Sequence, residues 1–352
     1  MLYEPTSTFV SALRLAVDAR DLATDTRGIG RYARAILRRL ITRSDVELTL
    51  LLLGPFPQLR RTSLARALGS NRFRVSSRVR GCDVVWHPAN GTFFESAVPA
   101  VVTLHDAVPF RFPHPDPVRR DNQQQPFLRS VATAARFIAV SEFGRREIVE
   151  VFGASADRID VVYHGVESVF APAPAGAAAE DALLFVGDPY AEERKNFPLL
   201  YDAYCAAFEG AEGPQLLVVG PSDPRQPRAQ YAGIADGDAR GGGDERLRDR
   251  YRSSLALCVP SFYETFGMPM IEAMACGTPV LASDASCLPE IAGGAALLVA
   301  ANDRQAWTQA LRRVAADADL RDQMRAAGIA RARAFDWDRS ASLHLQIFRS
   351  LQ

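Results

Sequence analysis

Residues 259–283 read VPSFYETFGMPMIEAMACGTPVLAS, which combines apolar runs with two acidic side chains. The run LALCVPS (255–261) predicts a buried strand, MPMIEAMACG predicts a helix that Gly277 ends, and TPVLASD predicts a second strand. Glu264 falls in the loop between the first strand and the helix, and Glu272 falls within the helix among apolar residues. Because a buried carboxylate is costly unless something pairs with it, the two glutamates indicate a binding site.

The rest of the chain repeats this alternation of short apolar runs and amphipathic stretches. The runs are continuously hydrophobic, which predicts parallel strands buried on both faces, as in doubly wound α/β sheets. The predicted strands are LRLAVDA (13–19), ELTLLLLG (47–54), VVWHPA (84–89), AVVTLHD (100–106), RFIAVS (136–141), RIDVVYHG (158–165), ALLFVGD (182–188), QLLVVG (215–220), LALCVPS (255–261), TPVLASD (278–284) and AALLVA (295–300). Ligands of such sheets bind beyond the carboxyl ends of the strands.

At 352 residues and 38.5 kDa the chain exceeds one ordinary core, so we expect two Rossmann-like domains that face each other across a cleft. The segment FAPAPAGAAAEDA (170–182) has the composition of an interdomain linker. A second segment rich in helix breakers, residues 220–245, is predicted to be a mobile surface loop.

Several classes of protein are disfavoured by composition. No apolar run approaches the roughly 18 residues that a membrane span needs, and the first residues lack the pattern of a secretory signal. The five cysteines are scattered, with no CxxC spacing, which predicts free thiols in a reducing cytoplasm.

The net charge is zero, but residues 1–80 hold 15 arginines against six acids. Such a surplus suits contact with anionic lipid head groups or phosphorylated acceptors, although a genome that favours arginine would also produce it. The whole chain contains 40 arginines and one lysine, Lys195.

Arg194 and Lys195 follow the predicted strand ALLFVGD in a loop that also holds Glu192 and Glu193. Two adjacent cations suit a diphosphate whose negative charge grows as it departs, whereas a solvated charged loop would have the same composition. A lone lysine in an arginine-rich chain favours the specific role. Gly187, just before this loop, would let the backbone approach phosphates.

His105 and Asp106 end the predicted strand AVVTLHD, where a His-Asp pair suits an acid/base dyad, part of a metal site or a structural histidine. No second histidine lies at ligand spacing, which disfavours a metal. The DxD-like pieces at 236–238, 317–319 and 336–338 follow no apolar strand, so we interpret them as loop or helix-flanking aspartates.

GIGRYA (28–33) matches the dinucleotide pattern G-x-G-x-x-A, but RDLATDTR separates it from the strand that it should follow directly. We interpret it as a glycine-rich loop that opens a helix. Ile29, Ala33, Ile36, Leu37 and Leu40 would form the apolar stripe of this helix.

Residues 264–272 resemble the signature of the family-4 retaining glycosyltransferases, which share the two-domain GT-B fold. That signature is two glutamates separated by seven residues, with a Phe-Gly and a small-residue helix between them. The stretches at 277–307 and 183–204 also resemble the family, and GIGRY, VVTLHD, AVSEFGRREIVEVFG and VVYHGV extend the resemblance over nearly the whole chain.

The resemblance implies a role for each candidate residue. Glu272 would bind the ribose, Glu264 would contact the donor-sugar hydroxyls, and His105 would touch the sugar near its reacting carbon. The diphosphate would be held by Arg194, Lys195, Gly30, Gly187 and the backbone amides at the helix start, those of Phe266, Gly267 and Met268.

The resemblance also implies the domain boundaries. The N-terminal acceptor-side domain would span residues 1–170, the linker 171–180 and the sugar-nucleotide domain 181–335. Residues 336–352 would form a last helix that packs back on the first domain.

The expected reaction is retaining transfer of a hexose from a nucleotide-diphosphate sugar to a hydroxyl of a glycan or lipid-linked acceptor in polysaccharide biosynthesis. The transition state would resemble an oxocarbenium ion, and a leaving-group phosphate oxygen would accept the acceptor's proton. Neither a metal nor another cofactor is expected. The first candidate for the transferred sugar is mannose, with GDP-mannose as donor, because DTRGIGRYARAIL and VVTLHDAVPF resemble bacterial surface-polysaccharide mannosyltransferases.

We expect a cytoplasmic protein at the inner face of the membrane, in contact with anionic lipid through its Arg-rich N-terminal domain and not with nucleic acid. Three alternatives stay open on these residues. They are a sugar-nucleotide epimerase or hydrolase on the same fold, a non-catalytic subunit of a glycan-synthesis complex and, least favoured, an NAD-dependent dehydrogenase.

Overall fold

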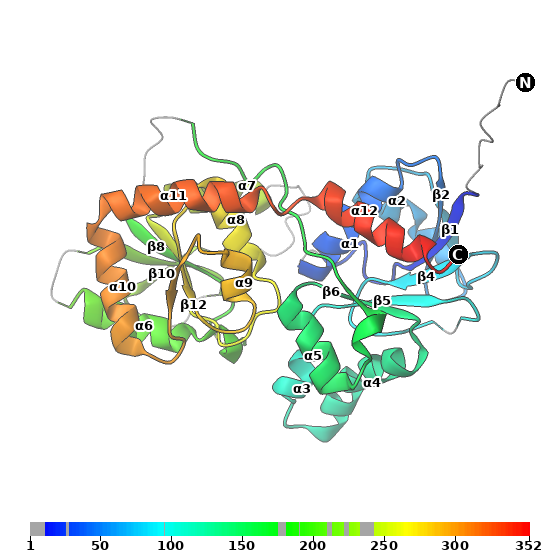
Figure 1. Ribbon diagram of the computed structural model, residues 1–352, viewed down its shortest axis with the longest axis horizontal. Coiled ribbons are helices and arrows are strands. Elements are labelled where there is room, and N and C mark those ends of the chain that lie inside the picture. Colours follow the sequence, from blue (N-terminus) through cyan, green and yellow to red (C-terminus); the bar gives the residue numbers. More distant parts are fainter. Residues whose placement is uncertain are drawn as a thin grey trace, which may run out of the picture. The chain divides into compact units, whose positions relative to one another are not determined.

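The computed structural model describes residues 11–25, 28–94, 96–174, 181–189, 191–209, 213–221, 225–232 and 243–352. The chain divides into two compact units, each built on one parallel sheet (Figure 1). The first unit comprises residues 1–139, 148–162 and 338–352, and the second comprises residues 140–147 and 163–337. Residues 175–180 of the expected linker lie outside the described residues.

Among the described residues, the sheet of the first unit has seven strands in the order β3-β2-β1-β4-β5-β6-β7. Its strands are β1 (Leu13–Asp18), β2 (Val46–Leu51), β3 (Arg74–Ser76), β4 (Val84–His87), β5 (Ala100–Leu104), β6 (Arg136–Ala139) and β7 (Ile159–Val161). Neighbouring strands pair in parallel throughout, with Leu15 of β1 opposite both Leu48 of β2 and Val84 of β4. The strand order changes direction between β1 and β4, the place where ligands of such sheets bind.

In the part of the second unit that the structure describes, six strands pair in parallel in the order β10-β9-β8-β11-β12-β13. They are β8 (Ala182–Val186), β9 (Gln215–Val219), β10 (Ala229–Ala232), β11 (Ala256–Val259), β12 (Val280–Ser283) and β13 (Leu297–Val299). The corresponding change of direction lies between β8 and β11. The two loops that carry the candidate cations and Glu264 leave the carboxyl ends of these two strands.

The predicted α/β class with buried parallel strands is confirmed, and each predicted run contains a strand. Two strands were not predicted, β3 and β10, and each lies at one edge of its sheet. An edge strand is paired on one side only, so it lacks the uniform apolar composition of a central one. Since β10 falls inside 220–245, the prediction that this whole segment is a loop is wrong. Residues 222–224 and 233–242 of it lie outside the described residues.

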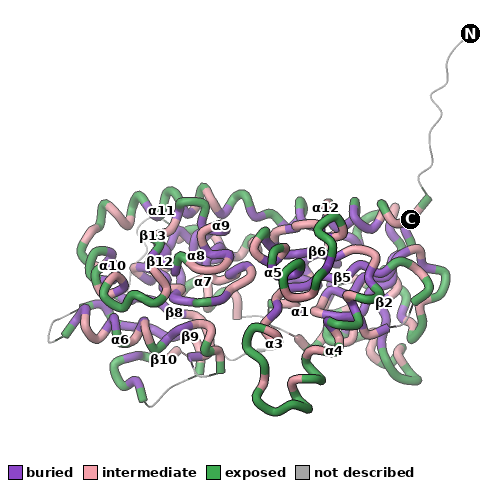
Figure 2. The backbone as a smooth tube through the Cα atoms, turned by 60° about the horizontal axis from the view of Figure 1, so that its bottom comes forward, coloured by how far each residue is buried: buried purple, intermediate pink, exposed green. Residues whose placement is uncertain are grey.

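Helices flank both sheets (Figure 1), and Figure 2 shows strands that are mostly buried beneath helices with an exposed side. In the first unit they are α1 (Gly28–Leu40), η1 (Pro57–Arg60), α2 (Arg61–Leu68), α3 (Val108–Arg111), α4 (Pro117–Thr133), η2 (Ala156–Arg158) and most of α12 (Trp337–Arg349). Helix α5 (Glu142–Phe152) begins in the second unit and ends in the first. The second unit adds η3 (Glu193–Lys195), α6 (Phe197–Ala207), α7 (Gly243–Ser253), α8 (Met268–Cys276), α9 (Leu288–Ala292), α10 (Arg304–Ala316) and α11 (Ala318–Ala332). Within the described ranges, none of these helices combines the length and the hydropathy that a membrane crossing requires.

Helix α1 buries more than the stripe that its sequence predicts. Ala33, Ile36, Leu37 and Leu40 are buried as expected and Ile29 is only half-buried, whereas Tyr32 is buried without having been predicted. The Tyr32 ring packs edge-on against Trp86 of β4 and His105, and it also contacts His344 of α12. Helix α1 is therefore enclosed by the sheet on one side and by α12 on another.

A directed chain of hydrogen bonds runs through this core. Trp86 Nε1 donates to Thr103 Oγ1 at 3.0 Å, Thr103 Oγ1 lies 2.9 Å from Tyr32 Oη, and Tyr32 Oη lies 2.5 Å from His344 Nε2. His344 Nδ1 lies 2.7 Å from the Ser340 carbonyl, which can only accept, so Nδ1 carries a proton. Burial lowers the pKa of His344 to about 4. The ring is thus neutral at pH 7, its Nε2 accepts from Tyr32, and Tyr32 in turn accepts from Thr103.

Candidate active site

The loop between β11 and α8 carries Glu264 at the carboxyl end of the sheet. Gly267 adopts φ 80° before the first residue of α8, and Gly277 ends the helix at φ 78° by donating its N–H to Ala273 O and Met274 O. Both positions favour glycine because a side chain is strained at positive φ. Within the described chain no side chain caps the start of α8. The amides of Phe266, Gly267 and Met268 thus lie at a helix start, a position that favours anions.

Glu264 is held between the two candidate cations. Its Oε1 lies 3.3 Å from Lys195 Nζ, and its Oε2 lies 3.3 Å from Arg194 Nη1. The Ser261 hydroxyl donates to Oε1 at 3.2 Å, and the Glu264 backbone N–H donates to Ser286 Oγ at 3.0 Å. The carboxylate is therefore held by the cation loop and by its own loop, and Ser286 fixes the backbone of Glu264 from a third.

The charge of Glu264 is stabilised by the same partners. Burial by itself raises the pKa of the Glu264 carboxyl, but the positive charges of Lys195 and Arg194, with hydrogen bonds from Lys195 and Ser261, lower it overall. Glu264 therefore stays ionised at neutral pH although its side chain is only 13% exposed.

Arg194 and Lys195 do not lie on a solvated surface. Their side chains are 21% and 13% exposed, so the interpretation as a charged loop in solvent is wrong for this pair. Glu192 accepts from Arg194 Nη2 at 2.7 Å and lies 3.7 Å from Lys195 Nζ. Two cations and two carboxylates thus form one ionic cluster, to which the sequence prediction did not assign Glu192.

Asn196 fixes the backbone that presents these cations. It adopts the left-handed conformation at φ 55°, and its side-chain amide donates to Pro260 O at 3.1 Å and to Ala301 O at 2.8 Å. The Phe262 N–H donates to Arg194 O at 2.8 Å. Asparagine tolerates this conformation better than most residues, and here it ties the cation loop to the loops after β11 and β13.

Gly187 makes room for the lysine. A Cβ at this position would lie 2.6 Å from Lys195 Cδ and 3.0 Å from its Cε, far closer than real contacts allow. Behind it, a Cβ on Gly220 would lie 2.0 Å from the Gly187 carbonyl oxygen. The glycines after β8 and β9 therefore let the Lys195 stem lie flat against the ends of the strands.

A small cavity of about 10 Å³ opens onto this cluster, lined by Lys195, Ser261, Glu264 and Gly267 among others. That volume is roughly what one water molecule needs. The ionic groups are therefore closed upon one another in this structure, and a ligand would have to separate them.

Glu272 lies apart from that cluster, inside α8. Its side chain is 1% exposed, and its Oε2 accepts from the Tyr251 hydroxyl of α7 at 3.1 Å. Tyr251 is itself fully buried, and its carbonyl accepts from Thr278 Oγ1. Tyr251 was not identified from the sequence, because the pattern gives no sign that α7 packs against α8.

Phe266 has a structural side chain. Its ring is 4% exposed and packs edge-on against His164, at 4.5 Å between ring centroids, and against Phe335, at 5.7 Å. Any contact of Phe266 with a ligand therefore involves its backbone, as the sequence interpretation proposed.

His105 and Gly30 belong to the first unit. His105 follows β5; its backbone N–H donates to Asn90 Oδ1 at 2.6 Å, and its Nε2 lies 2.8 Å from the Pro88 carbonyl. Since a carbonyl only accepts, Nε2 carries the proton. Burial lowers the pKa of His105, so the ring is neutral and its Nδ1 has acceptor character. Asp106 accepts from Asn90 Nδ2 and from the Val108 N–H at the start of α3.

Gly30 lines a cavity of about 160 Å³ at the carboxyl ends of β1 and β4, together with Asp18, Arg20 and Asp25 among others. A Cβ on Gly30 would lie 1.9 Å from the Asp25 carbonyl oxygen. The close approach of the Asp25 backbone is thus sufficient to require glycine here. β1 ends at Asp18 and α1 starts at Gly28, so the glycines do not follow the strand as the dinucleotide pattern demands.

The DxD-like pieces have structural roles where they are described. Asp317 caps α11 by accepting from the Leu320 N–H at 2.9 Å, and Asp338 pairs with Arg39 at 2.5 Å. Residues 236–238 lie outside the described residues. Among the described histidines, cysteines, aspartates and glutamates, no group of three is placed to hold a metal ion.

Two families match this chain, one for each half. The family described as "Glycosyltransferase Family 4" matches residues 26–170, and that described as "Glycosyl transferases group 1" matches residues 180–317. The chain belongs to glycosyltransferase family 4. It is a glycosyltransferase that moves a sugar from a nucleotide sugar, and the ionic cluster lies within the second matched region.

Curated relatives are similar at modest identity. O-antigen chain mannosyltransferase B of Escherichia coli is 27% identical over 92% of this chain and 96% of the relative. Phosphatidyl-myo-inositol mannosyltransferase of Mycobacterium leprae is 33% identical over 61% of this chain and 59% of the relative. D-inositol 3-phosphate glycosyltransferase of Kribbella flavida is 31% identical over 72% of this chain and 66% of the relative. The enzyme thus matches less than two thirds of the length of the last two relatives.

Solved structures share the fold. Sucrose-phosphate synthase from Thermosynechococcus elongatus superimposes with a TM-score of 0.68 at 20% identity, covering 96% of this chain and 99% of that one. Anabaena HepE, in complex with UDP and glucose, gives a TM-score of 0.70 at 16% identity, covering 96% of this chain and 100% of that one. WaaG, a glycosyltransferase involved in lipopolysaccharide biosynthesis, gives a TM-score of 0.67 at 13% identity, covering 96% of this chain and 99% of that one. The enzyme therefore has the expected GT-B fold.

Proposed function

We propose that this enzyme transfers mannose from GDP-mannose, with retention, to a hydroxyl of a glycan or lipid-linked acceptor in polysaccharide synthesis. The observation that carries the donor site is the contact of Glu264 with both Arg194 and Lys195 in a nearly closed cluster. The cluster lies where the strand order of the second sheet changes direction, at the carboxyl ends of β8 and β11.

The donor diphosphate would take the place of Glu264 as partner of the two cations. Arg194 and Lys195 already face a carboxylate about 3.3 Å away, and phosphate oxygens offer more negative charge. The helix-start amides of Gly267 and Met268 would bind the remaining phosphate oxygens. Glu264, released from the cations, would then accept hydrogen bonds from the sugar hydroxyls.

Glu272 would bind the ribose, and His105 would contact the sugar at its reacting carbon. A neutral His105 with an acceptor at Nδ1 suits a hydroxyl partner. As the nucleotide diphosphate leaves, charge grows on its phosphate oxygens, where Arg194 and Lys195 stabilise it most. One of these oxygens would take the acceptor's proton.

Mannose is proposed because two of the relatives are named as mannosyltransferases, one of them similar along nearly its whole length. A thermal-shift screen with GDP-, UDP-, TDP- and ADP-sugars tests the donor directly. A donor at 100 times its Kd adds about 2.7 kcal/mol of stability. We expect GDP-mannose to stabilise the enzyme most, and a larger shift with another nucleotide sugar would replace it.

Product analysis tests the reaction. With acceptor present we expect a mannosylated product that retains the configuration of the donor's anomeric carbon. Free mannose formed equally with and without acceptor would favour a hydrolase, and a changed sugar still attached to the nucleotide would favour an epimerase. A lipid-linked acceptor would place the enzyme at the cytoplasmic face of the membrane, in contact with anionic lipid through its first domain.

A further inference from the structure

The carboxylate of Glu290 joins two segments of the second unit that lie far from it in the sequence. Glu290 belongs to α9; its Oε1 accepts from the backbone N–H of Glu142 at 2.7 Å, and its Oε2 accepts from that of Phe143 at 3.0 Å. The Tyr163 hydroxyl donates to Oε1 at 2.9 Å. Burial and this bond raise the pKa of Tyr163 to about 12, so the hydroxyl keeps its proton. Protein donors therefore occupy both oxygens of the carboxylate.

The two amides open α5, whose first residues belong to the second unit. The first N–H groups of a helix lack partners within it, and the positive end of the helix dipole favours a negative charge. Glu290 supplies both the acceptors and the charge from 148 positions away. Arg331 of α11 fixes α9 in turn, since its guanidinium donates to Glu290 O at 2.8 Å and to Ile291 O at 2.9 Å. The carboxylate is therefore a fixed support for the start of α5.

The first turns of α5 hold the loop between β11 and α8. The fully buried Ser141 donates from its Oγ to Thr265 O at 2.6 Å. The Tyr263 hydroxyl donates to Glu147 Oε2 at 2.9 Å. The three residues after Thr265 supply the helix-start amides, and Tyr263 O accepts from Arg194 Nη1 at 3.2 Å. Both the amides and one of the two candidate cations are thus connected to α5.

We propose that Glu290 is a positioning residue for sugar transfer, because by fixing the first turn of α5 it holds the helix-start amides where they bind the donor diphosphate. Its own oxygens are occupied, so it acts through Ser141 and Tyr263. Charge on the diphosphate grows as the bond to the sugar breaks, so a displaced loop costs turnover more than affinity. The proposal rests on the proposed function, which takes the start of α8 as the phosphate site.

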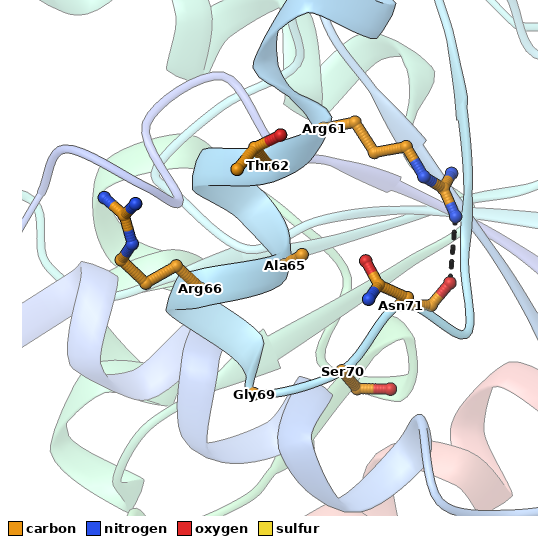
Figure 3. Close-up of a pocket in the computed structure, with 7 residues that line it drawn as sticks. All are labelled: Arg61, Thr62, Ala65, Arg66, Gly69, Ser70 and Asn71. Atoms are coloured by element: carbon orange, nitrogen blue, oxygen red, sulfur yellow. Dashed lines mark hydrogen bonds between the residues drawn. The ribbon is translucent and has the colours of Figure 1, made fainter.

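The hollow beside α2 is less suitable for the diphosphate. It measures about 550 Å³ and is lined by Arg61 and Arg66 among others (Figure 3). Arg61 donates to Phe73 O at 2.9 Å and to Asn71 O at 3.0 Å, the latter bond drawn in Figure 3. The figure shows the two arginine side chains pointing away from each other. The two cations of the second unit, in contrast, converge on Glu264.

Glu290→Gln tests the positioning. The side chain keeps its size but loses its charge and one acceptor oxygen, so it cannot accept from both α5 amides. We expect kcat for sugar transfer to fall at least about tenfold and GDP affinity to fall about threefold, because displaced binding groups cost most in the transition state. Guanosine, which has no phosphate, should bind as it does to the wild type. Steady-state transfer, calorimetry with GDP and competition with guanosine measure these quantities.

Asp317→Asn is the matched control. Asp317 caps α11 of the same unit, and the exchange likewise removes a charge and one acceptor oxygen at a helix start. It should leave kcat and GDP affinity within about twofold of wild type, as changes away from a site usually do. A fall in kcat equal to that of Glu290→Gln would overturn the proposal.

Ser141→Ala tests the path through α5, because it breaks the bond to Thr265. It should lower kcat as Glu290→Gln does. In the double variant kcat should be close to that of the slower single variant, since both changes act on one connection. Falls in kcat that multiply in the double variant would exclude this path. If Glu290→Gln does not fold, wild-type kcat in Ser141→Ala overturns the proposal.

Two further outcomes contradict the proposal. A folded Glu290→Gln with wild-type kcat, whatever its melting temperature, would make Glu290 purely structural. Equal losses of GDP and guanosine affinity would mean that the change does not act at the phosphates. Weaker GDP binding in Arg66→Gln, with none in Glu290→Gln, would move the phosphate site to the hollow beside α2.

The wild type separates this proposal from the proposed function. If another nucleotide sugar is the donor, the donor is corrected, and the same variants are measured with its nucleoside diphosphate and its nucleoside. If the wild type transfers no sugar, the proposed function fails. The difference between diphosphate and nucleoside affinity in Glu290→Gln then still decides the role of Glu290.

Discussion

The Tyr32 hydroxyl donates to His344 Nε2 over 2.5 Å, joining two residues that lie 312 positions apart. Tyr32 belongs to α1 and His344 to α12, the first and the last helix of the described residues. Both are buried, and their bond is the final link of the chain that starts at Trp86. The Tyr32 ring also packs on His105, with 4.7 Å between ring centroids. The last helix thus helps to position the histidine proposed to touch the donor sugar.

Tyr32→Phe should destabilise the enzyme by about 1–3 kcal/mol, because the buried His344 Nε2 loses its donor. The ring stays, so the edge-on contact with His105 is kept. The denaturation midpoint in urea measures the change. Tyr231→Phe is a control from the other unit, since Tyr231 is partly exposed and its hydroxyl donates to Gln226. Equal losses of stability in the two variants would show that the buried series of hydrogen bonds contributes no more to the free energy of unfolding than the partly exposed bond does.

Stability should also depend on pH through His344. Its pKa falls from 6.5 to about 4 on folding, so the unfolded state binds the proton more readily. The contribution of the neutral ring is therefore complete above pH 6.5 and declines as the pH falls toward 4, by up to about 3 kcal/mol. His344→Gln keeps an acceptor for Tyr32 but does not titrate, so its stability should decline less between these pH values. If the stability of the wild type and of His344→Gln declined equally over this pH range, the pH dependence would not come from His344.

Lys195→Arg should reduce turnover about 100-fold, the cost of misplacing a reacting group by about 1 Å. The lysine stem lies against Gly187, and a planar guanidinium there would compete with Arg194 for the same oxygens. Steady-state transfer is the measurement, with the melting temperature recorded in parallel and expected to change little. Arg304→Lys, the reverse exchange at an exposed site, serves as control. Turnover within twofold of wild type in Lys195→Arg would place the phosphate site elsewhere.

Glu264→Gln should change GDP affinity and turnover in opposite directions. Loss of the charge that faces Arg194 and Lys195 should tighten GDP binding about threefold, while loss of the contact with the sugar should lower kcat about 100-fold. Glu192→Gln relieves the same two cations and leaves Glu264 in place. It should therefore tighten GDP binding without a comparable fall in kcat. Calorimetry and steady-state kinetics measure both, and weaker GDP binding in both variants would exclude the proposed exchange of partners.

Glu272→Gln should weaken GDP binding at least tenfold, since each hydrogen bond to a charged group is worth about 1.5–3 kcal/mol. The substitution conserves volume in a fully enclosed position of α8. Tyr251→Phe removes the hydrogen bond to Glu272 but keeps its charge. GDP affinity should change much less in Tyr251→Phe, and calorimetry on both variants gives the comparison. Unchanged affinity in a folded Glu272→Gln would remove this glutamate from the site.

The central strands could be predicted from the sequence, because a strand that is buried on both faces is a short, unbroken run of apolar residues. The edge strands β3 and β10 could not, because Arg74–Ser76 and Ala229–Ala232 are half-exposed and carry polar residues. Glu264 could be placed in its loop from local pattern alone. Its contacts with Lys195 and Arg194, 69 and 70 positions away, and the burial of Tyr32 against His344 depend on tertiary packing that no local pattern contains.

Helix α12 has a consequence for how the protein is made. The ribosome delivers the strands of the first sheet early, but Trp86 and Tyr32 gain their contacts with His344 and Phe348 only when α12 emerges. Residues 163–337 leave the ribosome before that helix. The unit whose synthesis starts first is therefore the last to acquire a complete interior, which reverses the usual order of cotranslational folding. Until α12 has been synthesised, the nascent chain carries all the residues of the second unit and a first unit that still lacks this helix.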